Sequence, residues 1–263
     1  MQCCQFPASI AKDVIVTFKG TRVLDFSTGW GGRLLGAIAA DVELYHGFDP
    51  NSALQEGHDE IISSLVPVEI RSNFSIRYEP FETATVASQE YDLVFTSPPF
   101  FDFELYSEEA GQSILSYPDL EDWVVRFLFA SVKKAWEVLE EDGHFVIHLQ
   151  DGESVLCERL CLFFLAYLPG AQHVGVIGWR GADGQTSPLW VFQKMKGKGG
   201  SATQTKAKKY LQEYYPETAA LLLKVKETSQ ERGGKRPRED GEDDTHPAKK
   251  KANSSKVSSN SNP

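Results

Sequence analysis

Residues 23–33 read VLDFSTGWGGR, an apolar run that passes through three glycines into a helical pattern. The first part has the β-rich character of a buried strand. Glycines let the backbone turn sharply and approach a ligand without obstruction by side chains. In an open α/β sheet, such a turn lies at the carboxyl ends of the strands, where ligands bind. We therefore expect a strand, a turn and a helix here, and the turn either binds a ligand or is a tight structural turn.

Segments of alternating type continue along the chain. We expect strands over residues 21–26, 42–48, 68–76, 91–95, 143–149, 173–179 and 189–194, and helices over residues 34–40, 52–65, 120–139 and 155–168. A loop-rich link joins the last two strands and suits an antiparallel hairpin. The alternation predicts an α/β fold, Rossmann-like and doubly wound, with a mostly parallel seven-stranded sheet that ends in this antiparallel hairpin.

An acid follows the second expected strand. In dinucleotide-binding folds, an acid at this position accepts hydrogen bonds from the hydroxyls of a ribose. Asp49, which precedes Pro50, occupies this position. The glycines depart from the pattern G-x-G-x-x-G, because the third one, Gly32, comes earlier than that pattern requires. Asp25 precedes the turn and is suited to the cationic methionine end of S-adenosylmethionine. These features predict a nucleoside cofactor and favour S-adenosylmethionine over a nicotinamide.

A second motif ends the expected strand 91–95, where residues 96–101 read TSPPFF. Two consecutive prolines fix φ and hold Ser97 and Pro98 extended, with their carbonyls free to accept hydrogen bonds. The Ser97 side chain and the Pro98 carbonyl suit the two N–H bonds of an amine, which orients its lone pair toward a methyl group. Phe100 adds an aromatic face for a planar substrate. The motif predicts methyl transfer to an exocyclic amine.

Both motifs resemble those of the class I S-adenosylmethionine-dependent amino-methyltransferases, which modify adenine N6, cytosine N4 or the amide of glutamine. The family signature is Asp, Asn or Ser, then Pro-Pro and an aromatic residue, as in Ser97-Pro98-Pro99-Phe100. The resemblance implies S-adenosyl-L-methionine as cofactor. The cofactor-binding residues that we expect are Asp25, Ser27, Gly29, Gly31, Asp49, Pro50, Phe81 and Glu82. Phe81 would pack on the cofactor adenine, and Glu82 would accept from its amino group.

Other residues are expected at the edges of this site. Phe101, Gln150 and Arg180 are candidates for substrate contacts, although Arg180 is also compatible with an exposed position in a structural hairpin. Phe6-Pro7 would cover the methionine end of the cofactor, and Trp30 either covers the cofactor or packs on a helix. The histidines have no metal-ligand spacing, and His148 is interpreted as a core or sheet-surface residue. We expect no metal.

The chain divides into three parts by composition. Residues 1–196 are the expected catalytic domain, and residues 197–227 a linker with a short helical appendage, whose hairpin pattern over residues 206–226 is interrupted near Pro216. Residues 228–263 are poor in large apolar side chains and are expected to be disordered. Two basic clusters in this tail resemble a bipartite nuclear-import signal and include Lys235, Arg236, Lys249, Lys250 and Lys251. We therefore expect an import receptor as partner and a nuclear location, or else a tail that only solubilises.

Charge bears on the substrate. Residues 1–200 carry 14 Lys and Arg against 28 Asp and Glu, whereas residues 201–263 carry 13 against 9. An acidic domain repels polyphosphates, so a basic partner subunit would help to hold a nucleic acid. No apolar run approaches the ~20 residues that cross a bilayer, and we expect a soluble protein without a membrane partner.

Three functions follow from these features. The first is methylation of a base amino nitrogen, adenine N6 or cytosine N4, in DNA or RNA. Serine at position 97 is more usual among the cytosine N4 enzymes of the family. Methylation of a protein glutamine is an alternative that the acidic surface tolerates better. A catalytically silent methyltransferase-fold subunit of a nuclear complex is another, and the intact motifs disfavour it.

Overall fold

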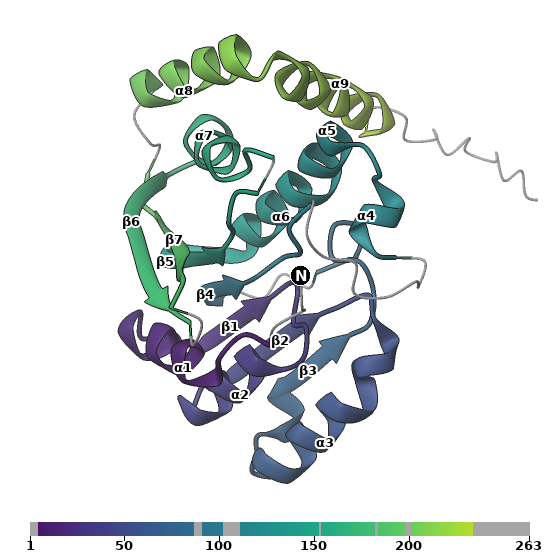
Figure 1. Cartoon of the computed structure of the whole chain (residues 1–263), viewed down its shortest axis with the longest axis vertical. Helices are drawn as coiled ribbons and strands as arrows, with labels where there is room; N and C mark the ends of the chain where they lie inside the picture. The colour runs from purple at the N-terminus through teal and green to yellow at the C-terminus, as the bar shows by residue number, and fades with distance from the viewer. Residues whose placement is uncertain are drawn as a thin grey trace, which may run out of the picture.

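A computed structural model describes residues 5–86, 91–101, 111–152, 154–181, 184–197 and 201–233, with the side chains of residues 201 and 226–233 excepted. Its seven-stranded sheet has the order β3-β2-β1-β4-β5-β7-β6 (Figure 1). The strands are β1 (Arg22–Asp25), β2 (Leu44–Phe48), β3 (Phe74–Arg77), β4 (Tyr91–Thr96), β5 (Leu139–His148), β6 (Ala171–Arg180) and β7 (Thr186–Lys194). Strands β1 to β5 pair in parallel, and β7 lies antiparallel between β5 and β6. The predicted Rossmann-like sheet with a terminal hairpin is confirmed.

Helices cover both faces of this sheet (Figure 1). They are α1 (Ala8–Thr17), α2 (Gly32–Ala39), η1 (Ser52–Leu54), α3 (Gln55–Leu65), η2 (Arg71–Asn73), α4 (Ser113–Ser116), α5 (Leu120–Asp122), η3 (Trp123–Phe129), α6 (Ala130–Val138), α7 (Cys157–Tyr167), α8 (Ser201–Tyr214) and α9 (Pro216–Gly233). None of these helices is long and apolar enough to span a membrane, as far as the described residues extend.

The central strands are apolar on both sides because both faces of the sheet are covered. In β4, Leu93 and Phe95 belong to the core beneath α1 and α2, whereas Val94 belongs to the core beneath η3, α6 and α7. In the second core, Phe164 of α7 stacks on Phe192 of β7 with ring centroids 3.8 Å apart. These two layers hold the carboxyl ends of β1, β2, β4 and β5 side by side.

Two expected elements differ from the structure. The expected strand 68–76 is a turn and η2 up to residue 73, and β3 begins at Phe74; Val68 is 69% exposed, so this apolar residue has no core to join. The expected single helix 120–139 consists of α5, η3 and α6, and η3 is a π-helix. Its wider turn buries six of its seven side chains, all except Arg126. Strand β5 begins at Leu139, which pairs with Tyr91 ahead of an irregularity in the register.

The expected helical appendage is present as α8 and α9, with the break at Tyr215 before Pro216. Leu211 and Leu222 are buried in the same core as α7, so the hairpin packs on the domain. Helix α9 continues to Gly233, so the first residues of the segment that was expected to be disordered have a helical backbone. The basic clusters at residues 235–238 and 249–251 lie outside the described residues.

Candidate functional site

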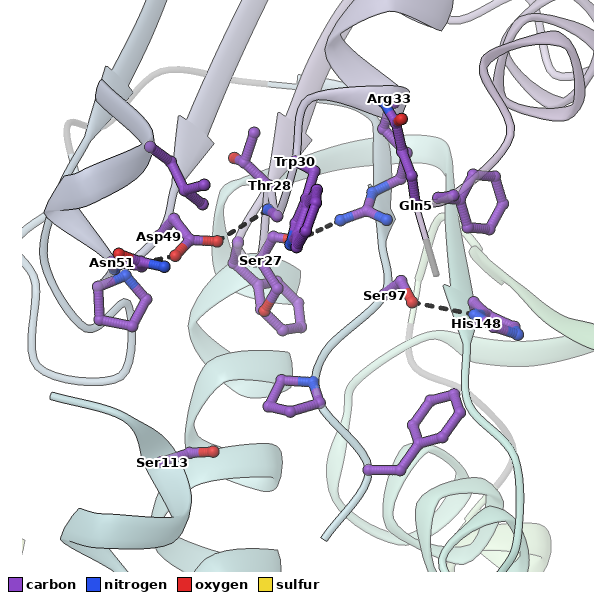
Figure 2. A pocket seen from close by; sticks show the side chains of 18 of the residues that line it. Gln5, Ser27, Thr28, Trp30, Arg33, Asp49, Asn51, Ser97, Ser113 and His148 are labelled. Carbon is purple, nitrogen blue, oxygen red and sulfur yellow. Dashed lines mark hydrogen bonds between the residues drawn. The ribbon is translucent and has the colours of Figure 1, made fainter. Parts of the chain in front are cut away.

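A cavity of about 650 Å³ opens at the carboxyl ends of β1, β2, β4 and β5. This position includes the switch point between β1 and β4, where open α/β sheets bind ligands, and the volume suits a ligand of nucleoside size. Figure 2 shows Asp49 and Asn51 on one side of the cavity and Ser97 with His148 on the other. Trp30 lies between these pairs, and Arg33 lies above Ser97 in this view (Figure 2). The two sequence motifs therefore line one cavity.

The glycine turn depends on left-handed backbone. Gly29 and Gly31 have φ of +59° and +86°, a region that glycine adopts without the strain of a Cβ atom. Asp49 fixes the turn to β2, because its Oδ2 accepts from the Gly29 amide at 2.8 Å and its Oδ1 from the Asn51 amide at 3.0 Å. Burial raises the pKa of Asp49. Since each carboxylate oxygen has two acceptor sites, Asp49 retains capacity toward the cavity, which it lines.

His58 supports the same turn from outside the cavity. One ring nitrogen lies 2.9 Å from the Gly29 carbonyl oxygen, and the other lies 3.0 Å from the Tyr78 hydroxyl. A Cβ atom on Gly31 would lie 3.3 Å from the His58 ring. Gly31 does not line the cavity, so the structure gives it a packing contact where a cofactor contact was expected. Nothing in the sequence distinguished His58, which belongs to α3.

Asp25 is fully buried behind the cavity wall. It accepts from Arg33 Nε at 2.8 Å, from the Tyr45 hydroxyl at 2.8 Å and from the Ser27 amide at 3.2 Å. Arg33 and Ser27 line the cavity, and Asp25 does not. Asp25 was expected to contact the methionine end of a cofactor, but Arg33 and Ser27 separate it from the cavity. Sequence reasoning missed Arg33, although it follows the glycines directly.

The segment after β3 forms another wall, as expected for Phe81 and Glu82. Phe81 stacks on Phe26 with ring centroids 5.2 Å apart, and only 2% of its surface is exposed. Lys134 of α6 donates to the carbonyls of Phe81 at 2.9 Å, Glu82 at 2.8 Å and Ala84 at 2.6 Å, which fixes this segment. Glu82 Oε2 is buried without a hydrogen-bond partner among the described residues, and burial raises the pKa of this carboxyl.

The Pro-Pro motif forms the opposite wall. Ser97, Pro99 and Phe100 line the cavity, while Pro98 is buried. The Ser97 hydroxyl lies 2.9 Å from His148 Nδ1 (Figure 2), and the Phe100 ring packs edge-on against His148 with centroids 5.3 Å apart. His148 was interpreted as a core or sheet-surface residue; it is the last residue of β5 and also lines the cavity. The sequence did contain a signal for this role, because His148 ends β5 and ligands bind at the carboxyl ends of parallel strands.

The substrate candidates separate in the structure. Gln150 lines the cavity, as do Phe6, Pro7 and Trp30. Phe101 packs edge-on against Trp123 with centroids 5.7 Å apart and is outside the cavity lining, because the backbone turns its ring toward the core. Arg180 is exposed outside the lining, and the neighbouring Trp179 is part of it. Neither Phe101 nor Arg180 therefore stands at the cavity as expected.

Comparison with known proteins agrees with this architecture. The structure is similar to the glycopeptide N-methyltransferase MtfA, with 11% identity, 72% of this chain and 95% of that chain covered, and a TM-score of 0.50. It is similar to the magnesium protoporphyrin IX methyltransferase ChlM from Synechocystis PCC 6803, crystallised with bound SAM, with 10% identity, 71% and 79% covered, and a TM-score of 0.50. At this identity the likeness concerns the fold alone, which is the Rossmann-like methyltransferase fold.

TrmN from Thermus thermophilus shares 15% identity, with 72% of this chain covered and a TM-score of 0.49. The match covers 49% of TrmN, so this chain spans about half the length of that protein. No protein-family model and no curated protein sequence matches the chain.

Proposed function

We propose that the chain binds S-adenosyl-L-methionine in this cavity and catalyses methyl transfer to an exocyclic amino nitrogen of a nucleic-acid base, adenine N6 or cytosine N4. The observation that carries the proposal is the shared cavity, which Asp49 and the glycine turn line together with Ser97, Pro99 and Phe100. A nucleoside-type site and an amine-orienting motif thus face the same space.

The residues present fit this cofactor. Glu82 Oε2 is a buried acceptor without a partner among the described residues, and an adenine amino group would satisfy it. Asp49 would accept from ribose hydroxyls, and Phe81 would provide an apolar wall for the adenine. Arg33 lines the cavity, and its guanidinium, which pairs with Asp25 at 2.8 Å, would also donate to the carboxylate of the methionine end. When bound, the cofactor supplies an electrophilic methyl group on sulfur.

The chain contributes orientation to the reaction. The lone pair of an exocyclic amine is delocalised into its ring, so the nitrogen attacks poorly until its two N–H bonds are held. The Ser97 hydroxyl, at the cavity wall, is the first proposed acceptor. The Pro98 carbonyl is proposed as the second from the motif alone, because Pro98 is buried outside the cavity lining. Phe100 holds the ring plane by stacking. The amine nitrogen would take the methyl group as its bond to the cofactor sulfur breaks, and would then lose a proton to water.

The aromatic rim supports a nucleic-acid base as substrate. Trp30 lines the cavity and is 56% exposed, and Trp179 lines it from β6. An exposed ring such as that of Trp30 stacks on unpaired bases, whereas Trp179 is half-buried. A base in a duplex would reach the cavity only by flipping out. We propose a single-stranded or flipped base, with a basic partner subunit to offset the charge of the domain.

A second candidate function is methylation of a protein glutamine. It is favoured by the acidic balance of residues 1–200, 14 cations against 28 anions, which a protein substrate tolerates better than a polyphosphate does. Either enzyme would act in the nucleus if an import receptor binds Lys235, Arg236, Lys249, Lys250 and Lys251, which we propose from their pattern alone. A catalytically silent subunit is the third alternative and would transfer no methyl group.

The test uses Phe100→Ala, with Tyr214→Ala as the matched control because Tyr214 is an exposed aromatic residue of α8 outside the cavity lining. Stacking on a base is worth about 1–3 kcal/mol, so Phe100→Ala should lower transfer of labelled methyl by about 5- to 150-fold. Cofactor binding, measured by calorimetry, should persist in both variants. Full transfer by Phe100→Ala would refute the placement of the site.

A further inference from the structure

His148 stands beside the amine-orienting motif and was assigned no role by sequence reasoning. Its Nδ1 lies 2.9 Å from the Ser97 hydroxyl oxygen. Its Nε2 is enclosed and has no hydrogen-bond partner among the described residues. Three rings surround the imidazole, with centroids at 5.3 Å for Phe100, 5.7 Å for Phe6 and 6.0 Å for Trp179. The histidine is therefore held in a fixed place against Ser97.

The imidazole is neutral near pH 7. Burial, and then the positive charge of Arg33, lowers the pKa of His148 to about 4. A neutral imidazole has one N–H donor and one acceptor nitrogen. An N–H at Nε2 can face the surrounding rings as a weak N–H···π contact. A lone pair there would have no donor within hydrogen-bond distance among the described residues, since the buried Nε1–H of Trp179 has no partner either. The surroundings thus favour the tautomer with the hydrogen on Nε2 and the acceptor at Nδ1.

This tautomer bears on the chemistry of Ser97. An aspartate at this position of the motif can only accept, whereas a serine hydroxyl both donates and accepts. Holding an amine requires an acceptor, so the hydroxyl hydrogen has to be directed away from the substrate. The acceptor Nδ1 of His148 provides a place for that hydrogen, and the oxygen lone pairs of Ser97 are then free for the cavity.

We propose that His148 is a positioning residue for amino methylation, which takes the Ser97 hydroxyl hydrogen at Nδ1 so that Ser97 presents only acceptor sites to the amine. Ser97 and His148 together then accept a hydrogen bond from the amine, as a single acidic or amide side chain does in the same motif. This inference rests on the proposed function for its catalytic consequence, but the hydrogen-bond polarity of the pair is a property of the chain alone.

The first experiment measures that polarity without any substrate. Nitrogen NMR of the full chain, with histidine labelled at both ring nitrogens, reports which nitrogen of His148 carries hydrogen. We expect an unprotonated Nδ1 and a protonated Nε2 across neutral pH, and a changed Nδ1 resonance in Ser97→Ala. A protonated Nδ1 would overturn the inference, whether or not the chain proves to be a methyltransferase.

The second experiment measures the catalytic consequence. His148→Phe keeps a ring but has no acceptor, so kcat should fall by about 5- to 100-fold, the equivalent of one lost hydrogen bond to a buried group. The Kd for S-adenosylmethionine should not change. His148→Asn, whose amide oxygen can replace the Nδ1 acceptor, should recover part of kcat. The matched control is His144→Phe in the same strand, because His144 packs against Phe18 away from the cavity.

A double-mutant cycle separates positioning from simple packing. In Ser97→Asp the side chain at position 97 accepts without help, so His148→Phe should cost much less kcat in that background than in the wild type. An equal loss in both backgrounds would overturn the inference, as would wild-type kcat in His148→Phe. If the wild type transfers no methyl group, the proposed function fails, and the NMR result alone decides the hydrogen-bond polarity.

Discussion

Lowering the pH from about 7 to about 5 should destabilise the folded chain through His148, and His148→Phe should remove this effect. The pKa of His148 is about 4 in the folded chain, against an ordinary value of 6.5. As the pH falls below 6.5, the unfolded chain therefore binds a proton that the folded chain does not. The contribution of His148 to the free energy of unfolding is therefore fully present above pH 6.5 and is lost progressively as the pH falls toward 4.

The magnitude follows from linkage. Each tenfold difference in proton affinity corresponds to about 1.4 kcal/mol, so the loss should reach about 2 kcal/mol at pH 5 and about 3 kcal/mol near pH 4. Urea unfolding followed by tryptophan fluorescence at several pH values gives the free energy of unfolding. Burial also lowers the pKa values of His46 and His144, but these groups are present in both proteins. Parallel pH profiles for wild type and His148→Phe would refute the reasoning.

Three further changes test the site and the core. Asp49→Ala should weaken calorimetric binding of S-adenosylmethionine by about tenfold or more, because the ribose loses a charged acceptor and the glycine turn loses its anchor; unchanged affinity would contradict the site. Phe164→Ala should lower the free energy of unfolding by about 3–5 kcal/mol in urea titrations, since it removes the stack on Phe192, and a loss under about 1 kcal/mol would contradict that packing. Gly36→Ala places a Cβ atom 2.4 Å from a side-chain carbon of α1 and should cost about 1–3 kcal/mol by overpacking. Its control is Gly57→Ala in α3, where the added Cβ meets nothing within 4 Å, and equal stabilities of the two variants would contradict the close approach of α1 and α2.

Much of the architecture could be predicted because its signals are local. Buried parallel strands appear as continuous apolar runs. Strand β1 is followed by glycines, which indicate a tight turn, and β4 is followed by two prolines, which indicate an extended segment. Once the strands are known to be parallel, their carboxyl ends meet. The gathering of Asp49 and Ser97 around one cavity therefore follows from periodicity and strand direction.

The remaining features depend on pairings between distant segments. The contact of Asp25 with Arg33, and that of Ser97 with His148, depend on side-chain directions and on the adjacency of β4 and β5. The π-helical η3 depends on the core that surrounds it, since the apolar run alone is typical of an ordinary helix. Phe101 follows the prolines, and only the fold decides that its ring turns to Trp123.

The proposed reaction is methyl transfer to a base amino nitrogen at the Ser97–Phe100 motif. The most direct measurement incubates the full chain with methyl-labelled S-adenosylmethionine and separate nuclear DNA, RNA and protein fractions, then digests the labelled fraction and identifies the methylated atom by mass spectrometry. We expect label on the exocyclic nitrogen of adenine or cytosine, reduced about 5- to 150-fold in Phe100→Ala. Label on a ring atom, label in the protein fraction, or no label with the wild type would contradict it.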